Sequence, residues 1–282
     1  HLPALVSCIL GPPLAFTYAS TLLSFGLHFR YPKLVWPVAA LALLPAALAA
    51  QLVRSALRAG VSMRWQLFAL TLLLVGALAG MIFGEVNFWH VCQPFYFLEA
   101  LKAYSDIDPS TVAGVRLMDA SKVYFSAGAR VAKDMGMSFT TDWDIYCVAP
   151  VTTSRGLPSQ GATLAHYDVW AVGVNCCRSA EPSFWCGESS GKAGLRQVGE
   201  AQRAFFRLAV QQAEVAYNIQ APHPVFFYWV KDPVARQSHF FETGFESWVL
   251  ANGAHFVING CLVFSFVFLC HKPPRDDWLP QL

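Results

Sequence analysis

One segment of the chain reads WQLFALTLLLVGALAGMIFG, from Trp65 to Gly84. It carries no charged residue, and its length of about 20 residues is what an α-helix needs to cross the hydrocarbon core of a bilayer. Within it, Gly76, Gly80 and Gly84 recur at every fourth position. This spacing puts small residues on one face, where a second helix can approach closely. We therefore predict a membrane helix that packs through a glycine ridge (Gly76, Gly80 and Gly84), against this chain or against a neighbouring subunit.

The rest of the chain also has the composition of a membrane protein. Of its 282 residues, 55% are apolar and 13% are charged, whereas about 25% are charged in typical soluble domains. Pro12 and Pro13 are expected to kink or end the first apolar segment, which is too long for a signal peptide and lacks a cleavage site. For the second apolar segment, Leu34–Val53, the alternative to a membrane-crossing helix is a hairpin arm that enters the membrane and returns. The three further apolar segments are Leu2–Phe29, Leu34–Val53 and Trp248–Leu269.

We predict a membrane α-helical fold of about four transmembrane helices, with a small α+β extramembrane domain inserted between helices three and four. Runs rich in Val, Tyr, Phe and Trp predict strands, and an apolar stripe at three-and-four spacing predicts a helix. The expected division is 1–85 for three helices, 86–246 for the α+β domain, 247–270 for the fourth helix and 271–282 for a tail. The expected elements are strands at Lys122–Ser126, Asp144–Val151, His166–Asn175 and Pro224–Val230, a helix at Leu195–Asn218, and a helix start at Asp108-Pro109.

The basic residues predict which way the chain faces. Five of them lie in the connector before the third helix and in the tail, against two in the loop between the first two helices. Short cytosolic loops are rich in Lys and Arg, so we expect the connector and tail in the cytosol or stroma, and residues 86–246 in the lumen or outside. That range holds 13 basic and 15 acidic residues, which does not suit nucleic acid. The five are Arg54, Arg58, Arg64, Lys272 and Arg275, and the two are Arg30 and Lys33.

Five cysteines fall within the expected extramembrane domain. Because disulfides persist in oxidising compartments, we predict structural disulfides rather than free thiols or a metal site. Five cysteines allow at most two bridges. The vicinal pair Cys176-Cys177 should bond to different partners, and Cys186 is the nearest candidate for one of them. The candidates are Cys92, Cys147, Cys176, Cys177 and Cys186.

The fourth apolar segment carries a polar stripe on one helix face, formed by Asn252, His255 and Asn259. Three interpretations compete: hydrogen bonding between helices, ligation of a tetrapyrrole metal by His255, and a proton or substrate path. Glu85, at the end of the third segment, is expected to be solvated or paired with a basic group, with a proton carrier or a metal ligand as alternatives.

The extramembrane domain contains no motif that predicts an enzyme. It has no Gly-rich phosphate loop, no HExxH and no serine-hydrolase signature. A nucleophile set or a calcium site would require side chains that the spacing does not bring together. A thiol oxidoreductase is a weaker alternative, because a vicinal cysteine pair departs from the C-x-x-C redox motif. The residues in question are Cys147, His166 and Asp168 for the nucleophile set, and Asp142, Asp144, Asp168 and Glu188 for calcium.

Two stretches carry a resemblance. They read YDVWAVGVNCC over Tyr167–Cys177 and FFRLAVQQAE over Phe205–Glu214. The chain, from about residue 85 to 270, resembles an uncharacterised multi-copy polytopic membrane-protein family of dinoflagellate algae. The resemblance implies a phototrophic host and brings no activity or catalytic residue. Glu85 and Glu246 lack the partners that chlorophyll-binding antenna proteins place after their glutamates, so an antenna protein proper is not expected.

The resulting hypothesis is a non-enzymatic accessory or structural subunit of a multi-subunit membrane complex. The resemblance favours a photosystem-associated complex in the thylakoid membrane, with other membrane subunits and lipid as partners and chlorophyll, carotenoid or lipid as cofactors. His255, flanked by Asn252 and Asn259, is then the first expected pigment contact, and His28 and His90 are weaker ones. The alternative is a plasma-membrane protein whose disulfide-braced exterior domain binds a ligand or partner.

Overall fold

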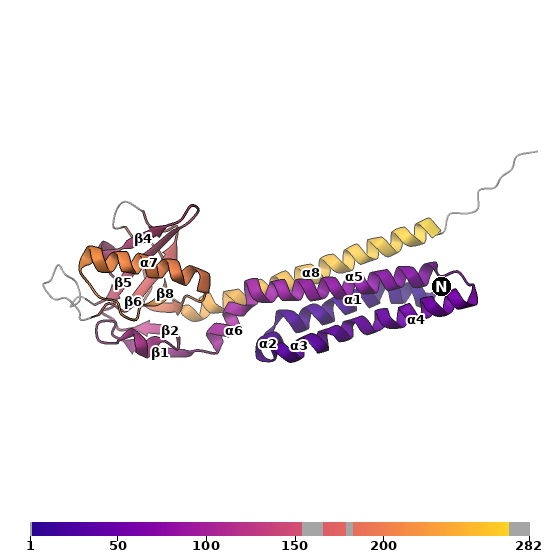
Figure 1. The fold of residues 1–282 in the computed structure, drawn as a ribbon, viewed down its shortest axis with the longest axis horizontal. Helices are drawn as coiled ribbons and strands as arrows, with labels where there is room; N and C mark the ends of the chain where they lie inside the picture. Colours follow the sequence, from indigo (N-terminus) through magenta and orange to yellow (C-terminus); the bar gives the residue numbers. More distant parts are fainter. Residues whose placement is uncertain (1, 154–165, 179–182, 271–282) are drawn as a thin grey trace, which may run out of the picture. The chain divides into compact units, whose positions relative to one another are not determined.

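A computed structural model describes residues 2–153, 166–178 and 183–270. The chain divides into two compact units, a helical unit (His1–Gln93 with Phe241–Leu282) and a sheet unit (Pro94–Phe240). Within the described residues, four helical stretches are long and apolar enough to cross a membrane (Figure 1). They are Ala4–Ser24, Pro32–Ala59, Arg64–Glu99 and Pro233–Leu269. The tail expected at 271–282 lies outside the described residues.

The helical unit is built from long helices that lie side by side (Figure 1). The first of them continues through Pro12 and Pro13, so these prolines do not end the helix. A 3₁₀ turn (Ala40–Leu43) joins the third helix to the fourth, and a π turn (Phe88–Cys92) follows the fifth. The helices are α1 (Leu2–Ser24), α2 (Gly26–Arg30), α3 (Pro32–Ala39), α4 (Leu44–Ala59), α5 (Arg64–Asn87) and, from Phe241 onward, α8 (Pro233–Cys270).

The glycine ridge of α5 packs against α1 of the same chain. A Cβ atom added at Gly76 would lie 2.7 Å from the Pro12 carbonyl oxygen, and one at Gly80 would lie 2.6 Å from the Phe16 carbonyl oxygen. Gly84 approaches the same helix equally closely. Only residues without a side chain allow two backbones to come this near. The ridge is therefore occupied within the chain.

The sheet unit contains a mixed eight-stranded sheet of order β1-β2-β7-β8-β6-β5-β3, with β4 paired to β5. The pairs β1–β2 and β6–β8 are parallel, and the other pairs are antiparallel. The strands are β1 (Lys102–Ile107), β2 (Ala120–Phe125), β3 (Arg130–Val131), β4 (Met137–Thr140), β5 (Ile145–Thr152), β6 (Val169–Val174), β7 (Ala193–Arg196) and β8 (Val225–Val230). The helices are α6 (Gln93–Glu99), α7 (Glu200–Tyr217) and two 3₁₀ turns (Gly114–Leu117 and Lys133–Met135).

The four expected strands correspond to β2, β5, β6 and β8, with ends shifted by a few residues. The expected helix starts too early, because Leu195 lies in β7 and pairs with both Lys122 and Tyr228. The helix start expected at Asp108 is also wrong. The Asp108 carboxylate accepts a hydrogen bond from the Ser110 N–H at 2.9 Å in a turn. Asp108 therefore closes a turn rather than capping an α-helix.

Two cores lie on opposite faces of the sheet, because successive side chains of a strand point to opposite sides. On one face, α7 covers the sheet (Figure 1) and Phe206 packs with Tyr146 and Trp170. On the other face, Trp229 and Phe227 belong to a second core that also contains four disulfide-bonded cysteines. This second face positions the candidate site. Its cysteines are Cys147, Cys176, Cys177 and Cys186.

Candidate functional site

A pocket of about 340 Å³ lies in the sheet unit, bordered by Trp229 of the core face opposite α7. Cavities that hold small ligands have volumes of about 300–1,000 Å³. Its walls come from β3 with the turn that follows it, from the segment 185–192, and from β8. These segments lie far apart in the sequence and meet only because the sheet brings them together.

The segment 185–192 is fastened to the sheet by covalent and hydrogen bonds. Cys186 is bridged to Cys176, and the Glu188 N–H donates to the Trp229 carbonyl at 3.1 Å. Between them, Gly187 has a φ of +81° and lies against the Trp229 backbone, a combination that only glycine adopts without strain. The wall of the pocket is therefore held in one position.

The charged side chains of the pocket are mainly basic. Lys192 is fixed, because its ammonium donates to the Ala127 and Ala129 carbonyls at 3.2 and 3.1 Å. Arg130 and Lys133 are exposed, and neither makes an ion pair within the described part of the chain. Glu188 is the single acidic residue of the lining. The lining therefore carries more basic than acidic side chains, which suits an anion better than a cation.

Two tryptophans give the same pocket an aromatic wall. Trp229 is buried and stacks on Phe125, with ring centroids 5.4 Å apart. Trp185 is 52% exposed. Burial of a large aromatic side chain stabilises a fold, so an exposed one forgoes part of that stabilisation. An exposed indole beside unpaired cations presents a flat apolar face next to positive charge.

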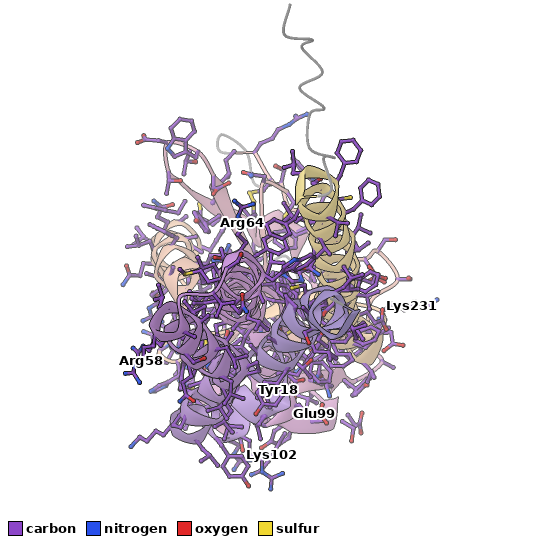
Figure 2. All side chains as sticks on the ribbon, turned by 90° about the vertical axis from the view of Figure 1, so that its right-hand side faces the viewer. Tyr18, Arg58, Arg64, Glu99, Lys102 and Lys231 are labelled. Atoms are coloured by element: carbon purple, nitrogen blue, oxygen red, sulfur yellow. A yellow bond between two sulfur atoms is a disulfide. The ribbon has the colours of Figure 1, made fainter. Side chains whose placement is uncertain are left out.

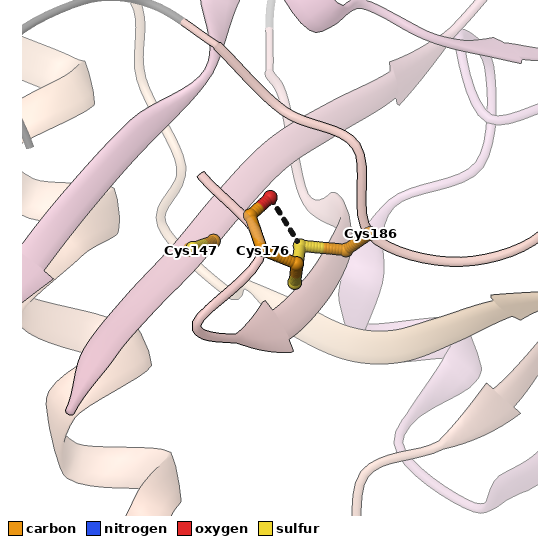
Figure 3. Close-up of side chains that lie close together, drawn as sticks. All are labelled: Cys147, Cys176 and Cys186. Carbon is orange, nitrogen blue, oxygen red and sulfur yellow. Dashed lines mark hydrogen bonds between the residues drawn. A yellow bond between two sulfur atoms is a disulfide. The ribbon is translucent and has the colours of Figure 1, made fainter. Parts of the chain in front are cut away.

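The disulfides join Cys147 to Cys177 and Cys176 to Cys186, so the vicinal cysteines bond to different partners. Figure 3 shows Cys147 close to the Cys176–Cys186 bridge, and the sulfurs of these three cysteines all lie within 4.8 Å of one another. Sulfurs in bridges offer no thiolate to a metal or a redox partner. Cys92 is a buried free thiol in the helical unit, which corrects its inclusion among the disulfide candidates.

The structure does not assemble the imagined nucleophile set. Cys147 is bridged, and His166 is exposed. Asp168 is buried and accepts hydrogen bonds from the Gly114 and His223 N–H groups at 2.9 and 3.1 Å. Asp168 therefore ties two loops to β6. Across residues 2–153, 166–178 and 183–270, the cysteine cluster is the only group of His, Cys, Asp or Glu with metal-ligand spacing, so the four acids considered for calcium do not converge.

The polar stripe of α8 faces α1. The Thr17 hydroxyl donates to the side-chain oxygen Oδ1 of Asn252 at 2.5 Å, and the Asn259 side-chain amide donates to the main-chain carbonyls of Cys8 and Ile9. The ring of His255 stacks on Phe16 with centroids 4.5 Å apart. These contacts match the interpretation of the stripe as hydrogen bonding between helices.

The other two histidines also contact their own chain. His28 is buried, with Nδ1 2.8 Å from the Leu23 carbonyl oxygen and Nε2 3.7 Å from a Glu85 carboxylate oxygen. The second Glu85 oxygen accepts from the Trp89 indole at 2.7 Å. His90 is exposed, with Nδ1 3.0 Å from a carbonyl one turn earlier. The pairing of His28 with Glu85 links α2 to α5 and was not foreseen from the sequence.

A second charged cluster lies on the parallel pair β1–β2. The Lys102 ammonium is 2.9 Å from the Asp119 carboxylate, and the Tyr104 hydroxyl donates to the same carboxylate at 2.8 Å. Hydrogen bonds from Lys102 and Tyr104 lower the pKa of Asp119. The same contacts raise the pKa of Lys102 and of Tyr104. The cluster holds its own counter-ion, which makes it a poorer anion site than the pocket.

The pocket was missed at the level of sequence. In the sequence, Trp185-Cys186-Gly187 places a cysteine between an aromatic residue and a glycine of the kind found in turns. The basic residues Arg130 and Lys133 lie more than 50 positions earlier, and only the register of β3 against β5 brings them near. A charge pattern along the chain contains no such information.

Comparison with models of known protein families, with curated proteins and with solved structures gave no match. Fold and site together define a protein whose described residues include four helical stretches long and apolar enough to cross a membrane and a disulfide-braced mixed-sheet unit.

Proposed function

We propose that the protein is a membrane-anchored binding protein whose sheet unit lies on an oxidising side of the membrane and binds an acidic saccharide. The observation that carries this proposal is the exposed ring of Trp185 beside Arg130 and Lys133 in a pocket of about 340 Å³. The sheet unit is then the recognition domain, and the helical unit is its anchor.

The chemistry of the pocket suits a sulfated or carboxylated sugar. The C–H face of a sugar ring is apolar and stacks on an indole, which supplies contact area without a charge. Guanidinium and ammonium groups bind sulfate and carboxylate through charge-assisted hydrogen bonds. The pocket places the two kinds of group side by side, as a ring with an anionic substituent requires.

Two observations support the orientation. The sheet unit contains both disulfides, and such bridges persist in oxidising compartments. The connector between α4 and α5 lies between Arg58 and Arg64, which appear at the end of the helical unit that faces the viewer in Figure 2. Basic connectors of this kind stay in the cytosol, so the sheet unit is expected across the membrane from them.

The outer surface of the helical unit supports its role as an anchor. Leu48 on α4 is 61% exposed, and Leu250 and Phe264 on α8 are 73% and 74% exposed. Side chains of this kind form large apolar surfaces that soluble monomers avoid. Lipid chains would cover them.

The test is a binding titration followed by tryptophan fluorescence, with dextran sulfate as the probe and neutral dextran of the same length as its control. The double variant Arg130→Gln, Lys133→Gln should weaken binding of the sulfated probe at least about tenfold, because two charge-assisted bonds are lost. The double variant Arg116→Gln, Arg203→Gln removes the same charge outside the pocket and should bind as the wild type does. Equal binding of the two dextrans, or equal losses in both double variants, would rule the proposal out.

A second candidate is an accessory subunit of a larger membrane complex, such as a photosystem-associated one in an alga of the kind the resemblance implies. One observation favours it: in the most apolar stretch of α8, only 11% of the residues are buried. This leaves a face of the helix free for another subunit. Native sizing after gentle detergent extraction separates the two. A large pigmented assembly that loses pigment in a His255→Leu variant would support the subunit, and a colourless monomer that binds dextran sulfate would support the binding protein.

A further inference from the structure

A second cavity, of about 550 Å³, lies between α1, α4 and α5 in the helical unit. Most of its lining is aliphatic, and small residues from all three helices contribute to it. On α5 the lining runs from Trp65 to Leu73, which spans roughly 12 Å at 1.5 Å per residue. The aliphatic lining residues are Ala4, Gly11, Leu48, Ala49, Leu52, Ala69 and Leu73.

One polar atom in this lining is unsatisfied. Gln66, the third residue of α5, is among the lining residues, and its carbonyl oxygen Oε1 is buried and has no hydrogen-bond partner within the described part of the chain. A buried acceptor without a donor costs about 1–3 kcal/mol, so a ligand that donates a hydrogen bond to this oxygen would be stabilised by it. The atom therefore indicates a missing donor.

The position of Gln66 restricts what that donor belongs to. It sits one turn from the connector, where a membrane helix begins, and the rest of the cavity extends along the helices toward Leu73. Apart from Ser7 and Gln66 the lining is apolar, so the occupant should be apolar along most of its length and carry one hydrogen-bonding group at its end. The wall is smooth where short side chains form it, and this suits a flat, rigid molecule better than a branched one. These side chains are Ala4, Ala49 and Ala69.

We infer that the cavity binds a sterol, with its single hydroxyl group on the Gln66 amide and its ring system against the alanines of α1, α4 and α5. A hydroxyl both donates and accepts, so it satisfies the amide in either orientation. A phospholipid fits less well, because its phosphate would need a cation and no Lys or Arg is among the residues that line the cavity; Arg58, at the same end of α4, extends away from the bundle (Figure 2). This site is separate from the saccharide pocket and does not depend on it.

The first test uses the full chain in sterol-free nanodiscs and a photoreactive cholesterol analogue. Labelling should map to peptides of α1, α4 or α5 and should be displaced by cholesterol. Cholesteryl methyl ether, which has the same body and no hydroxyl hydrogen, should displace it at least about tenfold less well. Equal displacement by both sterols, displacement by phospholipid alone, or labels on α8 only would overturn the inference.

The second test uses variants whose folding can be measured. Without sterol, Gln66→Leu should raise the melting temperature, because it removes the unsatisfied acceptor; with cholesterol, the wild type should gain stability and the variant should gain less. Gln51→Leu, an exposed glutamine on α4, is the matched control and should gain as much as the wild type. If the wild type gains nothing from cholesterol, or both variants behave alike, the cavity is not a sterol site.

Discussion

The side-chain amide of Asn259 donates to the main-chain carbonyl of Cys8 at 3.0 Å and to that of Ile9 at 3.1 Å. These carbonyls lie four residues before Pro12 and Pro13, which have no N–H to give them. One side chain of α8 therefore satisfies both acceptors that the prolines leave open in α1. This explains how α1 stays helical through two consecutive prolines, and it gives Asn259 a structural role as a link between α8 and α1.

Replacing Asn259 with Leu should destabilise the helical unit by about 1–3 kcal/mol, since it leaves two carbonyls unsatisfied. Thermal or denaturant unfolding in detergent measures the change. In a background where Pro12 and Pro13 are both Ala, the helix supplies its own donors, so the same substitution should cost much less. An equal cost in both backgrounds would contradict the link between Asn259 and the prolines.

The glycine ridge gives a second prediction. Gly80→Ala should loosen the packing of α1 on α5, because the new methyl group would lie 2.6 Å from the Phe16 carbonyl oxygen. Overpacking of this kind costs about 1–3 kcal/mol. Gly253→Ala on α8 is the control, since nothing lies within 4 Å of its added Cβ. Because alanine has the higher helix propensity, this control should unfold no more easily than the wild type, and a similar loss in both variants would mean that the close contact with Phe16 does not set the effect.

The ridge shows how far a sequence pattern reaches. The repeat of Gly76, Gly80 and Gly84 predicted a close helix contact, and the structure has one. It could not say which helix is the partner, because any smooth apolar face accepts the same ridge. The effect of Pro12 on α1 could not be predicted from the sequence pattern. It depends on a hydrogen-bond donor nearly 250 positions later, in Asn259.

The two disulfides should contribute unequally to the sheet unit. The Cys147–Cys177 bridge closes a loop with a sequence separation of 30 and the Cys176–Cys186 bridge one of 10. In the chain-entropy description the longer loop stabilises more, by about 1 kcal/mol. Paired Cys→Ala variants of each bridge, compared by urea unfolding, test this. Cys261→Ser is the control, because Cys261 is a free thiol; losses of the opposite order would count against the entropic account.

The cluster on β1 and β2 predicts a response to pH. The pKa of Asp119 is lowered by Lys102 and Tyr104, so its contribution to stability is present above the ordinary aspartate pKa and is lost as pH falls through the lowered value. In an NMR titration, Lys102→Met should move the Asp119 midpoint upward, toward the ordinary value. Lys231→Met, outside the cluster, should not move it. An unchanged midpoint in Lys102→Met would show that the contact is absent in solution.

The site was less accessible to sequence reasoning than the fold. Runs rich in Val, Tyr, Phe and Trp predicted the strands that became β5 and β6, with ends shifted by a few residues. The pocket depends instead on long-range register, which brings Arg130 and Lys133 to the segment that follows Cys186. His28 and Glu85 illustrate the same limit, because each was considered alone and the structure pairs them across two helices.

The most direct measurement is a structure of the full chain with a sulfated dextran oligosaccharide bound. If the pocket binds an acidic saccharide, a sugar ring should lie on the exposed face of Trp185 and a sulfate within hydrogen-bonding distance of Arg130 or Lys133. An empty pocket at a saturating concentration of the oligosaccharide, or density for it only at the β1–β2 cluster or another surface, would contradict the proposed function.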